Sequence, residues 1–196
     1  DPISANALAD LVEEGRIQGF ARTVHHLDSY SHPGVAARQT RGLTAATELF
    51  TVSHIWKETL FTEYRRHAPV VGNGVDLARF SPEEGPQDND LRARYGLPQN
   101  GRLLLSVGGV ERRKNTLVLL QAFDALRKNY PDLHLVIAGG ASLLDHSAYR
   151  SLFDELVQRR GLENAVTLTG PVADADMSAF YRQAAVLAYP SQTEGF

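Results

Sequence analysis

Short apolar segments alternate with amphipathic segments along most of this 196-residue chain, and this alternation restricts the fold more than any other feature. Leu103–Val107 is an apolar run typical of a strand buried on both faces of a parallel sheet. The segment 149–157 instead carries apolar residues at helical spacing. Such alternation with short connections predicts βαβ units, hence an α/β fold with mostly parallel sheets. Strands are expected at residues 21–25, 48–52, 68–71, 103–107, 133–138, 165–169 and 185–189.

A polar stretch rich in proline, glycine and acidic residues interrupts this pattern at residues 81–90. It has no periodicity, and breaker-rich segments of this kind are typical of linkers or domain-boundary loops. We therefore expect one domain part at residues 1–80, a linker at 81–90 and a second domain part at 91–196. Locally, Ser53 is a suitable N-cap for a helix, and so is Asp174 for a short helix around Met177.

The composition excludes several classes of protein. With 43% apolar residues and a net charge of −3, the chain is not intrinsically disordered and has no broad basic surface for nucleic acid, so no nucleic-acid partner is expected. No apolar run is long enough to span a bilayer. The absence of cysteine excludes disulfides and thiolate metal sites and fits a cytoplasmic protein. Peripheral contact with a membrane stays open.

The residues that follow the strand at 103–107 are suited to binding an anion. Gly108 and Gly109 allow the backbone to approach a ligand, and Arg112, Arg113 and Lys114 stand at the start of the next helix. Helix N-termini attract anions in open parallel sheets, and these cations add charge to that attraction. The alternative is that the three cations form a solvated surface cluster.

Other strand ends carry similar residues. Gly139-Gly140, Gly170-Pro171 and the segment 190–196 with Glu194 all follow expected strands, which together favour a nucleotide-like ligand. The usual glycine fingerprints of NAD and ATP sites are absent. His25 and His26 end the first clear strand; either could contact a ligand, but a half-buried histidine satisfied by backbone carbonyls is the simpler interpretation.

Five segments in order resemble retaining glycosyltransferases of the GT-B fold, group 1, glycosyltransferase family 4. Residues 71–76 with 80–82 resemble the family's "NGVD…F.P" segment, and 106–115 its donor-phosphate loop. Residues 170–172 resemble "G.v", and Pro190–Phe196 resembles the opening of "PS..EGFG…E". Thr23-Val24-His25 resembles the strand end that supplies an active-site histidine. The likeness runs from about Ala21 to Phe196.

This resemblance implies a fold and an activity. The chain would hold the later part of an acceptor-side Rossmann-like domain and the earlier part of a donor-binding one, as a fragment of a longer enzyme. It would transfer a sugar from a nucleoside-diphosphate sugar to an acceptor hydroxyl with retention, without metal or cofactor. The acceptor would be a glycan, a lipid or a small molecule. The second carboxylate of the last signature would lie beyond Phe196, so this chain alone is expected to be inactive.

The resemblance also assigns roles to residues. His25 and Glu194 would be the catalytic pair, with Glu194 holding sugar hydroxyls. The donor-binding residues implied are Gly108, Gly109, Arg113, Lys114, Gly170, Val172, Gly195 and Phe196. Two positions depart from the family pattern. Gly109 replaces the usual arginine, so Arg112 or Arg113 would supply the second cation, and His26 replaces a common aspartate, leaving open which histidine faces the substrate.

Two other functions are compatible with these residues. A non-catalytic nucleotide-sugar binding or interaction module would keep the donor site but transfer nothing. A GT-B-like epimerase or phosphorylase would use the same fold; the phosphorylase would also need pyridoxal phosphate, for which no strand-to-helix lysine signature is present.

Overall fold

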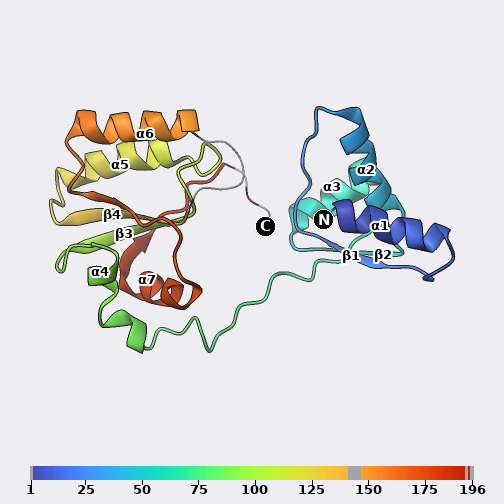
Figure 1. The fold of residues 1–196 in the computed structure, drawn as a ribbon, viewed down its shortest axis with the longest axis horizontal. Helices are drawn as coiled ribbons and strands as arrows, with labels where there is room; N and C mark the ends of the chain where they lie inside the picture. The colour runs from blue at the N-terminus through green and yellow to red at the C-terminus, as the bar shows by residue number, and fades with distance from the viewer. Residues whose placement is uncertain (1, 141–146, 193, 195–196) are drawn as a thin grey trace. The chain divides into compact units, whose positions relative to one another are not determined.

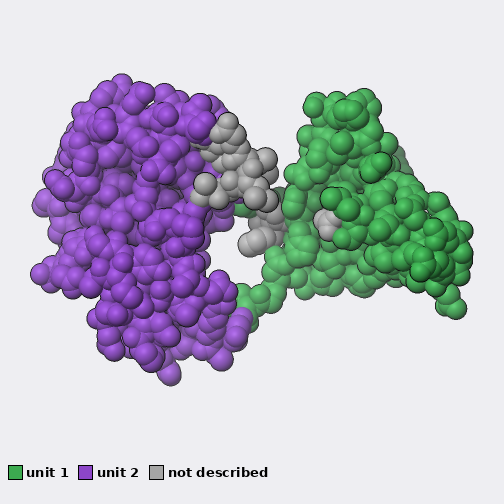
Figure 2. All heavy atoms as spheres, viewed as in Figure 1, with its two compact units in different colours: residues 1–75, 194–196 green, residues 76–193 purple. Residues whose placement is uncertain are grey.

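The structure is a computed structural model that describes residues 2–140, 147–192 and 194. The chain divides into two compact units (Figure 2), residues 1–75 with 194–196 as unit 1 and residues 76–193 as unit 2. Each unit contains its own parallel sheet, which confirms the predicted α/β class. No helix in the described ranges is long and apolar enough to cross a membrane.

Unit 1 places three helices around a two-stranded parallel sheet (Figure 1). Its elements are α1 (Pro2–Glu13), β1 (Ala21–Val24), α2 (Pro33–Thr44), β2 (Glu48–Thr51) and α3 (His54–Tyr64). Val24, Leu43, Leu49 and Leu60 form its buried core. The predicted cap of α3 is confirmed, since the side chain of Ser53 accepts a hydrogen bond from the amide of Trp56.

The strand expected at residues 68–71 is reduced to one bridge between Thr51 and Val70. Pro69 still accepts a hydrogen bond from the Thr51 amide through its carbonyl oxygen, at 3.0 Å. Proline has no N–H, however, so it cannot donate to a ladder and the strand does not extend. The prediction of a full strand was wrong for this reason.

Unit 2 has helices on both faces of a four-stranded parallel sheet in the order β5-β4-β3-β6 (Figure 1). Its elements are η1 (Pro86–Asp88), α4 (Leu91–Arg94), β3 (Arg102–Val107), α5 (Thr116–Arg127), β4 (Leu133–Ala138), α6 (Ser147–Arg160), β5 (Val166–Leu168), η2 (Asp174–Asp176), α7 (Met177–Gln183) and β6 (Ala184–Leu187). Phe123 and Phe153 pack one face, and Leu91 and Phe180 the other. β3 is therefore buried on both faces, as its apolar run predicts.

Two local predictions in unit 2 need correction. Leu152, assigned to the apolar stripe of the helix now labelled α6, is 46% exposed, whereas Tyr149 and Phe153 of that stripe are buried. The N-cap position of α7 is Asp176 rather than Asp174, because a 3-10 turn (η2) precedes the helix. Asp176 makes no side-chain cap; it accepts hydrogen bonds from Arg94 and Tyr95 instead.

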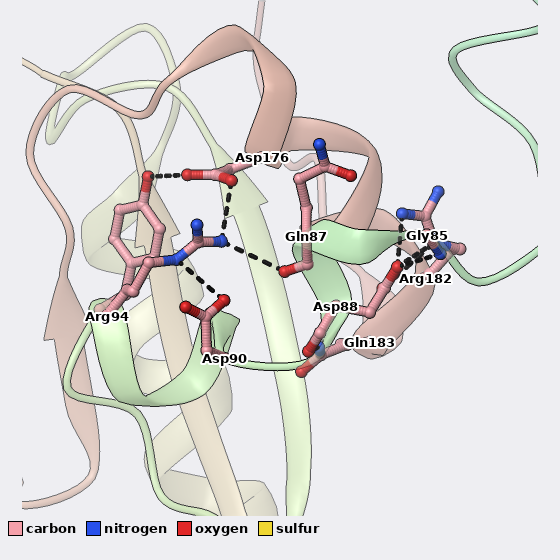
Figure 3. A network of polar contacts seen from close by, with 9 residues as sticks. Gly85, Gln87, Asp88, Asp90, Arg94, Asp176, Arg182 and Gln183 are labelled. Carbon is pink, nitrogen blue, oxygen red and sulfur yellow. Dashed lines mark hydrogen bonds and ion pairs between the residues drawn. The ribbon is translucent and has the colours of Figure 1, made fainter.

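Residues 81–90, expected as a linker, are bound to unit 2 by polar contacts (Figure 3). Asp88 in η1 accepts hydrogen bonds from Nε and Nη2 of Arg182 in α7, the latter at 2.7 Å, and both side chains are nearly buried. The Gln183 amide donates to the backbone oxygen of Asp88 at 2.8 Å. This stretch is polar because it forms these specific contacts.

Candidate functional site

The carboxyl ends of β3, β4 and β5 meet at one edge of the unit 2 sheet. The Gly108 amide donates to the Ala138 oxygen at 2.8 Å, and Gly139 forms a bridge with Gly170. Gly108 and Gly139 have φ of 121° and 149°, in the range that favours glycine. A Cβ on Gly139 would lie 2.8 Å from the backbone of Gly108, so these turns pack without side chains between them.

Gly109 has no room for a side chain in this backbone. A Cβ there would lie 2.6 Å from the backbone oxygen of Gly140 and 3.3 Å from Oε1 of Glu111. The absence of the expected arginine at this position therefore coincides with a close approach of two strand ends. An anion here must take its second positive charge from another residue.

Lys114 lies over the glycine turn, at the end of β3. A Cβ on Gly108 would be 3.1 Å from Cε of Lys114, so the lysine stem covers this glycine. Nζ of Lys114 donates to Oη of Tyr189 at 2.7 Å and lies 4.5 Å from the centre of that ring. Asn115, in the left-handed conformation with φ of 57°, then leads into α5. The sequence placed Lys114 at this edge but did not single out Tyr189, whose only signal is that it follows an expected strand.

The two arginines before Lys114 have different surroundings. Arg112 lies over the ring of Tyr149 in α6, with its Cζ 5.4 Å from the ring centre. Nη2 of Arg113 lies 3.6 Å from Oε2 of Glu111, whose side chain is 9% exposed. Glu111 also lies beside Gly109, so Arg113 is the arginine connected to the glycine turn.

The remaining predicted donor-site residues lie in different places. Gly170, with φ of 67°, lies at the edge, whereas Val172 packs against the core cluster of α4 and α7. The Gln192 amide donates to the Arg113 oxygen at 3.0 Å, which brings the segment after β6 to the same turn. Oγ of the neighbouring Ser191 is buried and has no hydrogen-bond partner in the described part of the chain. Gly195 and Phe196 lie outside the described residues, and Glu194 is half-buried and grouped with unit 1.

His25 and His26 follow β1 in unit 1, and both are exposed, so the interpretation as half-buried core histidines was wrong. Nε2 of His26 lies 3.3 Å from Oδ2 of Asp28, which also accepts a hydrogen bond from Tyr30. Gln39 in α2 binds both the amide and the carbonyl of Asp28 and so holds this loop. Within the described residues, His25 has no such partner, and no group of three His, Asp or Glu side chains could hold a metal ion.

Curated relatives cover part of the chain. A D-inositol 3-phosphate glycosyltransferase of Kineococcus radiotolerans is 38% identical over 131 residues, 65% of this chain and 29% of that protein. A mannosylfructose-phosphate synthase of Agrobacterium fabrum is 30% identical over 134 residues, 67% of this chain and 29% of that protein. The matched segment thus spans less than a third of these relatives.

Solved structures cover nearly all of the chain. Sucrose-phosphate synthase from Thermosynechococcus elongatus superposes with a TM-score of 0.79 at 22% identity, over 100% of this chain and 50% of that chain. Anabaena HepE, solved with UDP and glucose, superposes with a TM-score of 0.81 at 18% identity, over 98% of this chain and 51% of that chain. These similarities show a GT-B type fold. The model of the family "Glycosyl transferases group 1" matches residues 87–196, more than half of the chain, and the chain belongs to this family.

Proposed function

We propose that this chain provides the donor-binding part of a glycosyltransferase that moves a sugar from a nucleoside-diphosphate sugar to an acceptor hydroxyl, with retention and without a metal ion. Family membership supports the reaction class. The observation that carries the proposal is the position of Lys114, whose ammonium lies at the edge where three glycine-lined strand ends meet. The relatives that bind UDP or UDP-glucose in solved structures support a nucleotide-sugar donor.

The first requirement of this reaction is to stabilise the leaving nucleoside diphosphate. Cations and helix N-termini that are already in place stabilise developing negative charge without reorganising. Lys114 would contact the diphosphate, and Arg113 would supply the second charge from its position beside Glu111. The N-terminus of α5, directly after Asn115, adds its helix dipole.

The second requirement is to hold the sugar while the bond to the leaving group breaks. Glu194 and the backbone amides of Gly195 and Phe196 would bind sugar hydroxyls, and His25 would orient the sugar. His25 is exposed, whereas Nε2 of His26 lies 3.3 Å from a carboxylate oxygen of Asp28. The acceptor hydroxyl would pass its proton to the leaving phosphate on the same face of the sugar, so no protein base is assigned.

The test is calorimetric titration of the chain with UDP, GDP and ADP, each compared with its nucleoside. Lys114→Ala should weaken binding of the preferred diphosphate by roughly tenfold to a hundredfold, because hydrogen bonds to charged groups contribute about 1.5–3 kcal/mol. Lys128→Ala, which removes an exposed lysine at the C-cap of α5, is the matched control and should change nothing. Unchanged binding by a folded Lys114→Ala protein would contradict the proposal.

A non-catalytic nucleotide-sugar binding module is the second candidate, and Gly109 favours it. The close approach of Gly109 to Gly140 leaves no space for the arginine that the family normally uses at this position. The two candidates predict the same diphosphate binding but differ in chemistry. A longer form of the protein that binds the donor with unchanged Lys114 dependence, yet neither transfers nor hydrolyses the sugar, would establish the module.

A further inference from the structure

The backbone on each side of Tyr189 is hydrogen-bonded to β3 or to the turn that follows it. The amide of Ala188 donates to the Leu105 oxygen at 2.8 Å, which extends the pairing of β6 with β3. Beyond Tyr189, the Gln192 amide donates to the Arg113 oxygen at 3.0 Å. The backbone that carries Tyr189 is therefore fixed to the same strand and turn that carry Lys114.

The side chains of Tyr189 and Lys114 meet in a geometry that defines where the ammonium lies. The Lys114 stem rests on Gly108, and its Nζ is both 2.7 Å from Oη of Tyr189 and 4.5 Å from the ring centre. A hydrogen bond and a cation–π contact thus act on one ammonium from one residue. Tyr189 is 49% exposed, so a ligand can reach this pair.

A phenol is a suitable partner for a lysine that must bind an anion. A carboxylate at this distance would cancel the positive charge and compete with a phosphate, whereas neutral phenol accepts a hydrogen bond and leaves the charge in place. A flexible lysine otherwise loses conformational entropy when it binds, and contact with a fixed partner reduces that loss.

We propose that Tyr189 is the positioning residue for Lys114, holding its ammonium at the donor edge for the diphosphate. The inference rests on the proposed function, since it concerns how the same anion site is organised. Tyr189 acts through Lys114, so its effect should depend on the presence of the lysine.

The experiment is a double-mutant cycle measured by calorimetry with UDP, GDP and ADP, using the full chain. Tyr189→Phe, which keeps the ring and removes Oη, should weaken diphosphate binding by about fivefold to tenfold, in the range expected for the net contribution of one typical hydrogen bond, because the ammonium that contacts the diphosphate is still present. Tyr189→Leu should weaken it further, by roughly tenfold to thirtyfold, since the ring contact is lost as well. Both effects should shrink to less than about twofold in a Lys114→Ala background.

The matched control is Tyr130→Phe, which removes another part-exposed phenol of unit 2, whose ring lies against Arg102 at the start of β3. It should leave diphosphate affinity unchanged. A second readout needs no ligand: the ¹⁵Nζ chemical shift of Lys114 should change in the Tyr189→Phe variant and stay the same in the Tyr130→Phe variant.

The outcomes separate the inference from the proposed function. If Lys114→Ala weakens binding but both Tyr189 variants bind like the unmodified chain, the inference is overturned and the proposed function stands. Equal losses for the Tyr189 variants with and without Lys114 would also overturn it, because Tyr189 would then act independently. If the unmodified chain binds none of the three diphosphates, the proposed function fails and the inference with it.

Discussion

Two arginines, one in each unit, are almost fully buried and yet have opposite surroundings. In unit 2, Arg182 donates to the carboxylate of Asp88 (Figure 3) and to the backbone oxygen of Ser81. In unit 1, Arg22 is 8% exposed, and its Nε and Nη1 are buried with no hydrogen-bond partner among the described residues; Nη1 lies close to Gly42. Burial lowers the pKa of Arg22, because desolvation disfavours the charged form.

The difference shows which unit compensates its buried ions. Unit 2 covers both faces of its sheet and pairs its most buried ions. Unit 1 has a two-stranded sheet and leaves a buried cation uncompensated, which costs stability. The donor edge belongs to unit 2, so we expect the anion site to rest on the unit whose buried ions are paired.

The largest expected effect comes from breaking the buried pair of unit 2. Asp88→Asn should lower the free energy of unfolding of unit 2 by about 3 kcal/mol, because it leaves the guanidinium of Arg182 buried without its counter-ion. Hydrogen exchange of the β3 and β4 amides measures the free energy of unfolding of unit 2 separately from that of unit 1. Asp90→Asn is the matched control: Asp90 is 61% exposed and its ion pair with Arg94 should contribute less than about 0.5 kcal/mol.

The same pair predicts a pH dependence. The hydrogen bonds from Arg182 lower the pKa of Asp88 from its ordinary value. A carboxylate with a lowered folded-state pKa stabilises the fold above its unfolded-state pKa, near 4, and this contribution is lost as the pH falls through the lowered value. The difference in the free energy of unfolding between the Asp88→Asn variant and the unmodified chain should therefore shrink below about pH 4. An equal difference at pH 7 and pH 3 would contradict the pairing.

In unit 1, removing the buried charge should have the opposite effect and raise stability. Arg22→Met keeps the aliphatic stem and removes a buried charge without a partner, so it should raise the stability of unit 1 by about 2 kcal/mol. The fluorescence of Trp56, the single tryptophan and part of α3, reports denaturant unfolding of this unit. Arg38→Met, at an exposed position of α2, should leave the denaturant concentration at the midpoint of unfolding unchanged. A destabilised Arg22→Met protein would show that the guanidinium has a stabilising role.

The smallest expected effect distinguishes the two arginines of the donor edge. Arg113→Ala should weaken diphosphate binding by about tenfold, since it removes the second cation beside the glycine turn, whereas Arg112→Ala should cost less than about threefold. Calorimetry measures both affinities, and the melting temperature shows whether the loss of the Arg113 side chain disturbs the fold. Equal losses for the two variants would contradict the assignment of Arg113.

Local signals in the sequence were sufficient for much of the fold. The strand at Leu133–Ala138 and the cap at Ser53 were predicted because apolar runs and capping side chains act over a few neighbouring residues. The full strand predicted at 68–71 does not form, because Pro69 has no N–H to donate; this reason is itself local and readable in the sequence.

The contacts that the sequence did not predict join distant positions. Asp88 and Arg182 lie 94 positions apart, and Lys114 and Tyr189 lie 75 apart, so only the folded sheet brings each pair together. Glycines and cations after strands indicate a ligand edge from local sequence, and the site stays a prediction; the contacts that surround Lys114 have no such local signal. Which arginine faces the turn depends on Glu111 and Tyr149, and that required the structure.

The central claim is that a nucleoside diphosphate binds at the carboxyl edge of the unit 2 sheet. The most direct measurement is an amide NMR titration of the ¹⁵N-labelled chain with UDP, GDP and ADP. We predict shifts that saturate together at Gly108, Lys114 and Gly170, with the amides of α1, α2 and β2 unchanged. Saturable shifts in the unit 1 helices with none at Gly108 or Lys114 would contradict the account.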